Sequence, residues 1–481
     1  MANQNVKENN TMMTDKYEFR MGKGYFDSEF KDTIVYFDVF FRKNILNSGY
    51  TISGGLKSII DHILNFKFED DDIEFLRSIG GFSEEYLSSL KEMGFTGDIY
   101  AVPDGTPVFP NEPVMTIRAN VIEAQLIETA LLSLFNHQTL ITTATKRITE
   151  AAKPYPVVEF GTRRGAGYSA NEASRCAYIA GCTGTSNMKC GKENNIPTMG
   201  TMAHSFISLF PTEYEAFLRY AKSNPEDCTF LVDTYNTLKS GIPNAIRVAK
   251  EFLIPNGYEF KGIRIDSGDL AYLSNKAREM LDEAGFPDAG ICLSNSLDET
   301  TIRSLIEQKA AVDNFGVGDN AAAPLARGNG VYKLVAMEQD GKIIPKIKVS
   351  EEDVKTIIPG YKKVYRFYDK QTNFALGDVI ALAHETIPED SYTLISPTYE
   401  WKKTELSNYY VKELQVPIFL NGELVYNVPS AQESREYCEK EFATLYPEIK
   451  RQHNPHGYYV DLSEELLKLK KDMTFAYRKM Q

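Results

Sequence analysis

The sequence has few features that mark a membrane, secreted or metal-binding protein. No apolar run approaches the roughly 20 residues of a membrane-spanning helix, and residues 1–10 are polar, without the apolar segment of a signal peptide. The six cysteines include no CxxC pair and fit no common zinc spacing. We therefore expect reduced cysteines in a soluble, cytoplasmic protein.

Positive charge is also scarce. The chain has 53 Lys and Arg against 66 Asp and Glu, a formal net charge of −13. This balance argues against nucleic acid or an anionic membrane surface as the main partner. It leaves room for small anionic ligands, because a few arginines can focus positive potential locally. A length of 481 residues is too great for one core and predicts two or three domains.

Between residues 156 and 317, short apolar strands alternate with helical segments. This alternation predicts parallel βα units. Six units whose strands all end in polar residues suit an irregular (β/α) barrel better than an open sheet, and the active sites of such barrels lie at the carboxyl ends of the strands. The predicted strands are 156–160, 196–200, 228–232, 262–265, 290–293 and 312–317. The predicted helices are 214–222, 243–252, 270–284 and 299–309.

The segments before and after this region differ from it. Residues 1–135 predict an α+β domain, and residues 136–330 hold the barrel. Residues 331–481 contain Asp340-Gly341 and Asn421-Gly422, which are strong hairpin signals between strand-like runs. They end in two predicted helices, 432–445 and 463–479. We expect this third domain to pack with the N-terminal portion or against the barrel.

His204 lies in the run 200–206, at the predicted carboxyl end of a buried strand. A neutral imidazole there can act as a nucleophile or carry protons near neutral pH. A single histidine is more often structural. The functional reading is favoured because other predicted strands also end in charged or hydroxyl residues.

Arginines and carboxylates follow several of these strands. Arg163 and Arg164 follow the first strand, and a guanidinium matches carboxylate or phosphate oxygens. Asp233 follows the third strand, and residues 266–269 (Asp-Ser-Gly-Asp) follow Arg264. These carboxylates suit Mg²⁺ or ribose hydroxyls, although Asp-Ser-Gly also forms ordinary turns and caps. No lysine ends a predicted strand, which disfavours Schiff-base chemistry.

Six motifs occur in order along the chain: Thr14–Tyr17, Glu159–Arg164, Gly200–Phe206, Leu231–Tyr235, Ile265–Asp269 and Gly330–Leu334. Six ordered motifs are far more specific than any one of them. From about residue 11 to the C-terminal helices, their order resembles that of the nicotinate phosphoribosyltransferase family.

The resemblance implies a homodimeric type II phosphoribosyltransferase of NAD biosynthesis with shared active sites. Such enzymes join nicotinate to phosphoribosyl pyrophosphate and couple the reaction to ATP hydrolysis through a phosphohistidine, here His204. The resemblance gives catalytic roles to Asp233 and Asp266, which would also serve Mg²⁺ and the ribose. It implies that nicotinate is bound by Tyr17 (from the neighbouring subunit), Phe160, Arg163, Ser186, Thr201 and Arg264. It gives the 5′-phosphate to Ser294 and Gly318.

Three alternatives remain open. Nicotinamide-using relatives carry an aspartate near the position of Ser186, and a serine there favours a carboxylate ligand. A barrel isomerase or lyase acting on a sugar phosphate would need neither ATP nor the Tyr17 motif. A binding protein without activity would not need His204, Arg264 and Asp266 together. One departure from the family pattern is Asp319, an acidic residue directly after Gly318.

Overall fold

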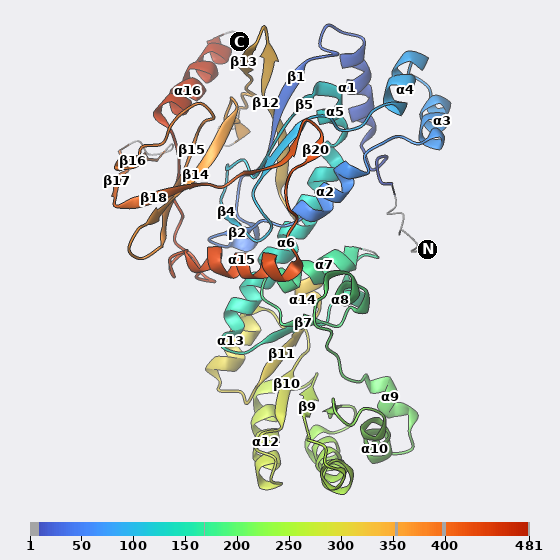
Figure 1. The fold of residues 1–481 in the computed structure, drawn as a ribbon. Coiled ribbons are helices and arrows are strands. Elements are labelled where there is room, and N and C mark those ends of the chain that lie inside the picture. Colours follow the sequence, from blue (N-terminus) through green and yellow to red (C-terminus); the bar gives the residue numbers. More distant parts are fainter. Residues whose placement is uncertain (1–8, 168, 352–354, 397–400, 480–481) are drawn as a thin grey trace. The chain divides into compact units, whose positions relative to one another are not determined.

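The computed structural model describes residues 9–167, 169–351, 355–396 and 401–479, which form two compact units (Figure 1). The barrel unit comprises residues 141–325 and 430–436. The flanking unit comprises residues 1–140, 326–429 and 437–481. The N- and C-terminal segments share the flanking unit, and the division into three domains stays a prediction.

Six parallel strands form the centre of the barrel unit, in the order β7-β6-β11-β10-β9-β8. Most of their apolar side chains are buried, as expected for parallel strands covered on both faces. Figure 1 shows β9, β10 and β11 side by side. The strands are β6 (Val157–Glu159), β7 (Gly184–Thr185), β8 (Thr229–Leu231), β9 (Gly262–Ile265), β10 (Gly290–Leu293) and β11 (Asn314–Val317).

The helices between these strands follow the predicted alternation. The segment predicted as a helix over 243–252 is α11, which is flanked by π-helical turns at 237–241 and 249–253. The helices of the unit are α7 (Ser169–Ile179), α8 (Met188–Asn194), α9 (His204–Leu209), α10 (Glu213–Ser223), α11 (Ile242–Val248), α12 (Leu270–Glu283), α13 (Glu299–Glu307) and α14 (Asp319–Ala322), and η2 (Thr162–Arg164) is a 3₁₀ turn.

One strand prediction was wrong. Residues 196–200 form only an isolated bridge, between Thr198 and Thr185 of β7. The Pro197 carbonyl accepts from the Thr185 N–H at 3.0 Å, and the Met199 N–H donates to the Thr185 carbonyl at 2.9 Å. Pro197 has no N–H with which to extend the pairing. His204 accordingly does not end a strand. It is the first residue of α9.

The flanking unit joins the two ends of the chain in one antiparallel sheet of order β13-β12-β1-β5-β3-β19-β20. β12 pairs with β1, and β19 pairs with β3, which confirms that the C-terminal segment packs with the N-terminal portion. A second sheet has the order β18-β14-β15-β21. The strands are β1 (Ile34–Phe41), β2 (Thr51–Ile52), β3 (Asp98–Ala101), β4 (Pro107–Val108), β5 (Met115–Asn120), β12 (Gly330–Gln339), β13 (Lys342–Pro345), β14 (Lys362–Asp369), β15 (Ala375–Leu382), β16 (Ser391–Ile395), β17 (Lys403–Ser407), β18 (Tyr409–Glu413), β19 (Val416–Leu420), β20 (Glu423–Leu424) and β21 (Val460–Leu462).

Both predicted hairpins form. Asp340 and Gly341 connect β12 and β13 with φ of 50° and 71°, and Asn421 and Gly422 connect β19 and β20 with φ of 50° and 78°. Two consecutive positive φ values are the signature of a type I′ turn, which matches the twist of the paired strands.

The helices of the flanking unit come from both ends of the chain. Helices α5 and α6 are separated at Ile127, and α6 continues into the barrel unit. The predicted C-terminal helices are α15 and α16. The helices are α1 (Lys16–Phe26), α2 (Leu56–Leu64), α3 (Asp70–Ile79), α4 (Glu84–Lys91), α5 (Val121–Leu126), α6 (Glu128–Ala152), α15 (Ala431–Ala443) and α16 (Glu464–Lys479).

All six cysteines are free and buried. Within the described residues, no helix is both long and apolar enough to cross a membrane.

Candidate active site

Arg264, on β9, is the centre of a hydrogen-bond network at the carboxyl ends of the barrel strands. Its Nε donates to Ser294 Oγ at 2.8 Å, Nη1 to Thr201 Oγ1 at 3.2 Å and Nη2 to Asp266 Oδ1 at 2.9 Å. Ser294 also donates to Asp266. The structure thus brings together four predicted residues from three chain segments.

Three of the five guanidinium N–H groups of Arg264 are used in these contacts, so two remain. One is on each terminal nitrogen, and such a pair suits a carboxylate that accepts in a bidentate manner. The Arg264 side chain is only 16% exposed, which keeps solvent competition low. The site is therefore prepared for an anion with planar oxygens.

The Phe160 ring lies beside this guanidinium, with its centroid 5.3 Å from the Arg264 Cζ. Phe160 follows β6, and its N–H donates to the Val317 carbonyl of β11 at 2.7 Å. Gly316 makes room for the ring, because a Cβ at this position would lie 2.4 Å from Phe160 Cε2. An aromatic face next to a cation suits a flat aromatic acid.

His204 is half-buried, and its Nδ1 lies 3.0 Å from Thr234 Oγ1. Thr234 follows β8 and belongs to the motif that contains Asp233. Sequence reasoning did not assign a role to Thr234. The sequence feature that could have indicated a role for Thr234 is its position directly after Asp233, at the end of a strand.

Asp233 accepts a hydrogen bond from Ser267 at 2.5 Å through Oδ2. Its Oδ1 is buried and has no hydrogen-bond partner among the described residues. Such an atom costs free energy unless a ligand satisfies it. No group of three or more His, Cys, Asp and Glu side chains suited to a metal ion occurs in the described part of the chain. A Mg²⁺ ion here would need oxygens from a bound phosphate or from water, which is its usual manner of binding.

Glu159, the last residue of β6, begins one of the six motifs but was given no role by sequence reasoning. It is fully buried, and its carboxylate accepts from the Gly161 N–H and from Thr185 Oγ1, the latter at 2.5 Å. The Glu159 carbonyl accepts from the Ser186 N–H at 2.9 Å. Glu159 therefore fixes both the turn that carries Phe160 and the start of the segment that carries Ser186. The sequence feature that could have indicated this role is a carboxylate at the end of an apolar strand.

The two arginines after β6 differ in their surroundings. Both are exposed in η2. Arg164 pairs with Asp319, with 2.6 Å between Nε and Oδ1. The acidic residue that departs from the family pattern is thus neutralised locally. Arg163 has no partner among the described residues, so its guanidinium is open to a ligand.

The remaining predicted residues lie in two different places. Gly318 directly follows β11, which pairs with β10 and β6. Tyr17 lies on α1 in the flanking unit and is 45% exposed.

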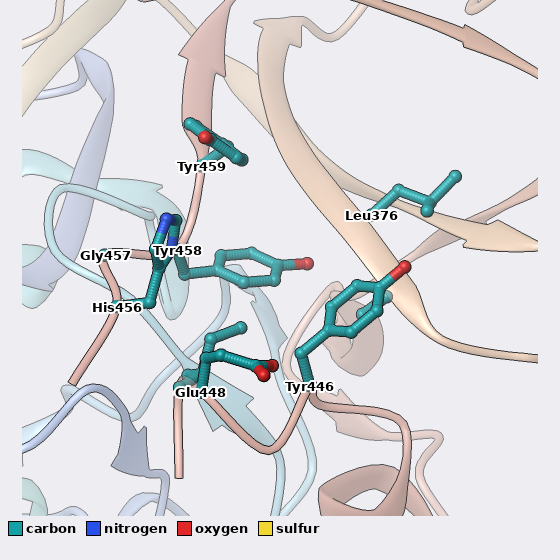
Figure 2. A pocket seen from close by; sticks show the side chains of 9 residues that line it. Leu376, Tyr446, Glu448, His456, Gly457, Tyr458 and Tyr459 are labelled. Carbon is teal, nitrogen blue, oxygen red and sulfur yellow. The ribbon is translucent and has the colours of Figure 1, made fainter. Parts of the chain in front are cut away.

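A hollow of about 180 Å³ lies elsewhere, in the flanking unit. Figure 2 shows Tyr446, Tyr458 and Tyr459 around it, with Glu448 and His456. None of the predicted site residues lines it. The barrel strand ends, with their charged network, remain the candidate site.

Known proteins resemble this chain over almost its whole length. Three models match in succession: the nicotinate phosphoribosyltransferase N-terminal domain over residues 12–136, the nicotinate phosphoribosyltransferase (NAPRTase) family over 155–364 and its C-terminal domain over 361–470. The nicotinate phosphoribosyltransferase of Bacillus subtilis is 42% identical over 459 residues, which cover 95% of this chain and 93% of the relative.

Solved structures agree. The crystal structure of human nicotinic acid phosphoribosyltransferase matches with a TM-score of 0.86 and 26% identity, covering 96% of this chain and 99% of that chain. A nicotinate-nucleotide pyrophosphorylase from Pyrococcus furiosus shares the fold, with a TM-score of 0.70 and 23% identity over 92% of this chain and 99% of that chain. The barrel-like fold with flanking N- and C-terminal domains is thereby confirmed. This chain belongs to the nicotinate phosphoribosyltransferase family.

Proposed function

We propose that the protein joins nicotinate to phosphoribosyl pyrophosphate, forms nicotinate mononucleotide and pyrophosphate, and couples this reaction to ATP hydrolysis. The observation that carries the proposal is the Arg264 network, which leaves one N–H on each terminal nitrogen beside the Phe160 ring. A carboxylate on a flat aromatic ring satisfies both features at once.

In this proposal Arg264 and Thr201 hold the nicotinate carboxylate, and Phe160 stacks on the pyridine ring. Ser186 lies near the carboxylate, where an aspartate would favour an amide. Arg163 binds nicotinate or the phosphates, since its side chain is exposed and has no partner among the described residues.

Phosphoribosyl transfer breaks the bond between C1 of the ribose and pyrophosphate, and the pyridine nitrogen forms the new bond to C1. Positive charge develops on the ribose as the bond breaks, and carboxylates nearby stabilise it. Asp233 and Asp266 have this role and also bind the ribose hydroxyls. Ser294 and the Gly318 backbone bind the 5′-phosphate.

The metal in this proposal is Mg²⁺, which when bound would lower the cost of the negative charge that develops on the leaving group. The open Oδ1 of Asp233 fits this group, and Asp266 is the second carboxylate.

ATP coupling uses His204. A ring nitrogen attacks the γ-phosphorus of ATP, the bond to the bridging oxygen breaks, and ADP leaves. Thr234 holds the imidazole during this step through its contact with Nδ1. Hydrolysis of the N–P bond later returns the histidine.

We further propose a homodimer with shared active sites, in which Tyr17 of one subunit stacks on nicotinate in the other. The exposed ring of Tyr17 supports this placement, because a tyrosine with a role in its own core is normally buried.

The test is direct. Purified protein is incubated with nicotinate, phosphoribosyl pyrophosphate and γ-labelled ATP, and nicotinate mononucleotide and labelled protein are measured. We expect product formation and an acid-labile, base-stable label that the variant His204→Asn lacks. Product from nicotinamide but not from nicotinate would contradict the proposal.

A further inference from the structure

Helix α14 follows β11, and its first two side chains contact the segments that follow both neighbouring strands. The sheet order places β11 between β6 and β10. Asn320 Nδ2 donates to the Ser296 and Leu297 carbonyls, which follow β10, at 3.1 Å each. Asp319 pairs with Arg164, which follows β6. Two consecutive residues of α14 thus connect the ends of three barrel strands.

The two connections differ in strength. The Arg164 and Asp319 side chains are 51% and 43% exposed, and an ion pair in such surroundings contributes little because water screens it. The Asn320 amide nitrogen carries two N–H groups, one for each carbonyl. Both carbonyls belong to the main chain, and Leu297 is fully buried. The Asn320 contacts are therefore the ones that hold a loop in place.

The loop that Asn320 holds has a costly backbone conformation. Asn295 has a φ of 106° and Ser296 has a φ of 45°, so two consecutive residues other than glycine lie in the left-handed region. Residues of this kind persist only where surrounding contacts hold them, and they concentrate at ligand-binding sites. The Asn320 amide supplies such a contact at Ser296 itself.

The same loop begins with Ser294, whose two donors are both engaged within the protein. The Ser294 N–H donates to the Ile265 carbonyl at 3.0 Å, and its hydroxyl donates to Asp266. The N–H groups of Asn295 and Ser296, in contrast, have no acceptor among the described residues. The free donors next to Ser294 therefore belong to the loop backbone, and phosphate oxygens accept from such groups.

We propose that Asn320 is a positioning residue for the 5′-phosphate of phosphoribosyl pyrophosphate. This inference rests on the proposed function, which gives this phosphate to Ser294 and the Gly318 backbone. Asn320 lies two residues after Gly318 and holds the loop that begins at Ser294, so it fixes the separation of the two phosphate-binding segments. A loop held in its bound conformation loses less freedom when phosphate binds, so affinity rises without a contact between Asn320 and the ligand.

The test is steady-state kinetics of the full-length protein with nicotinate, phosphoribosyl pyrophosphate and ATP. Asn320→Ala removes both bonds to the loop. It is expected to raise KM for phosphoribosyl pyrophosphate about fivefold to thirtyfold, the effect of one to two neutral hydrogen bonds. The kcat and the KM for nicotinate are expected to stay unchanged, because Arg264 and Phe160 are held by other contacts.

Two further variants separate this role from side-chain shape and from folding. Asn320→Leu keeps the approximate shape without an N–H group, and it is expected to match Asn320→Ala in KM. Asn275→Ala is the matched control. Asn275, on α12, is half-buried like Asn320 and accepts from the Ala311 N–H at 3.0 Å, near the amino end of β11. This control is expected to lower Tm and to leave both KM values unchanged.

Hydrogen–deuterium exchange reports on the loop directly. Without substrates, the amides of residues 294–298 are expected to exchange faster in Asn320→Ala than in wild type, and Asn275→Ala is expected to leave their exchange unchanged.

An unchanged KM for phosphoribosyl pyrophosphate in Asn320→Ala would overturn the inference and leave the proposed function intact. Wild-type behaviour of Asn320→Leu, or equal rises in both KM values, would overturn it in the same way. A wild-type protein that forms no nicotinate mononucleotide from phosphoribosyl pyrophosphate would contradict the proposed function and the inference together.

Discussion

Selectivity for nicotinate over nicotinamide is expected to depend on Arg264, and the structure gives the size of the effect. Arg264→Gln removes the charge and the two N–H groups that remain after the three contacts made within the protein. A hydrogen bond to a charged group contributes about 1.5–3 kcal/mol, or roughly tenfold to a hundredfold in kcat/KM. Because the Arg264 side chain is 16% exposed, little of this is lost to solvent screening.

The assay compares kcat/KM for nicotinate and for nicotinamide in wild type and in Arg264→Gln. We expect the ratio between the two substrates to fall by about tenfold to a hundredfold. The variant also leaves Asp266 without its cation, which affects both substrates equally and therefore cancels in the ratio. Arg264→Lys serves as the charge control. One ammonium group cannot donate to three protein partners and also donate two hydrogen bonds to a carboxylate, so the ratio of kcat/KM values still falls, though less than in Arg264→Gln.

Equal losses for both substrates would refute the reasoning, because Arg264 would then support the site without reading the carboxylate. Equal kcat/KM for the two substrates in the wild-type protein would refute it as well.

Other predictions concern the histidine, the subunits and the aromatic wall. His204→Asn is expected to abolish ATP coupling and to leave weak ATP-independent transfer, and undiminished ATPase activity would exclude the phosphohistidine. Thr234→Val, which keeps the shape without the hydroxyl, is expected to slow labelling by γ-labelled ATP about fivefold, as a lost hydrogen bond would; an unchanged rate would argue against it. Mixed Tyr17→Ala and His204→Ala proteins are expected to recover roughly a quarter of wild-type activity, since about half of the dimers hold one intact site; no recovery after verified subunit exchange contradicts shared sites. Gly316→Ala is expected to raise KM for nicotinate, because the new Cβ displaces Phe160, and an unchanged KM would mean that the ring does not contact nicotinate.

The sequence predicted the barrel strands best where an apolar run is bounded by turn residues. The bounds of β9 and β10 equal those predicted, 262–265 and 290–293. The strand prediction for residues 196–200 was wrong because these residues have the local pattern of a strand. Pro197 and the two-residue length of β7 limit the pairing to one bridge. The apolar pattern of a segment indicates its local structure, and it does not indicate whether a neighbouring strand is long enough to pair with it.

Buried charges were hidden from the sequence for a different reason. Arg366 of β14 and Asp378 of β15 are fully buried and pair at 2.6 Å between Nη2 and Oδ2. Each alone argues against a buried position, and only the register that places them opposite each other makes burial possible. The role of Glu159 was hidden similarly, since its donors, Gly161 and Thr185, come from separate segments.

The site shows how an acidic chain prepares a place for anions. Arg264 is paired with Asp266, and Arg164 is paired with Asp319, so neither arginine adds a full positive charge at the strand ends. Both pairs leave guanidinium N–H groups free to turn to a ligand while the carboxylates hold the side chains in place. Arg163 is exposed without such a pair among the described residues and supplies the uncompensated charge. In the proposed function, a site built in this way orients the carboxylate and phosphate groups of the substrates by geometry first.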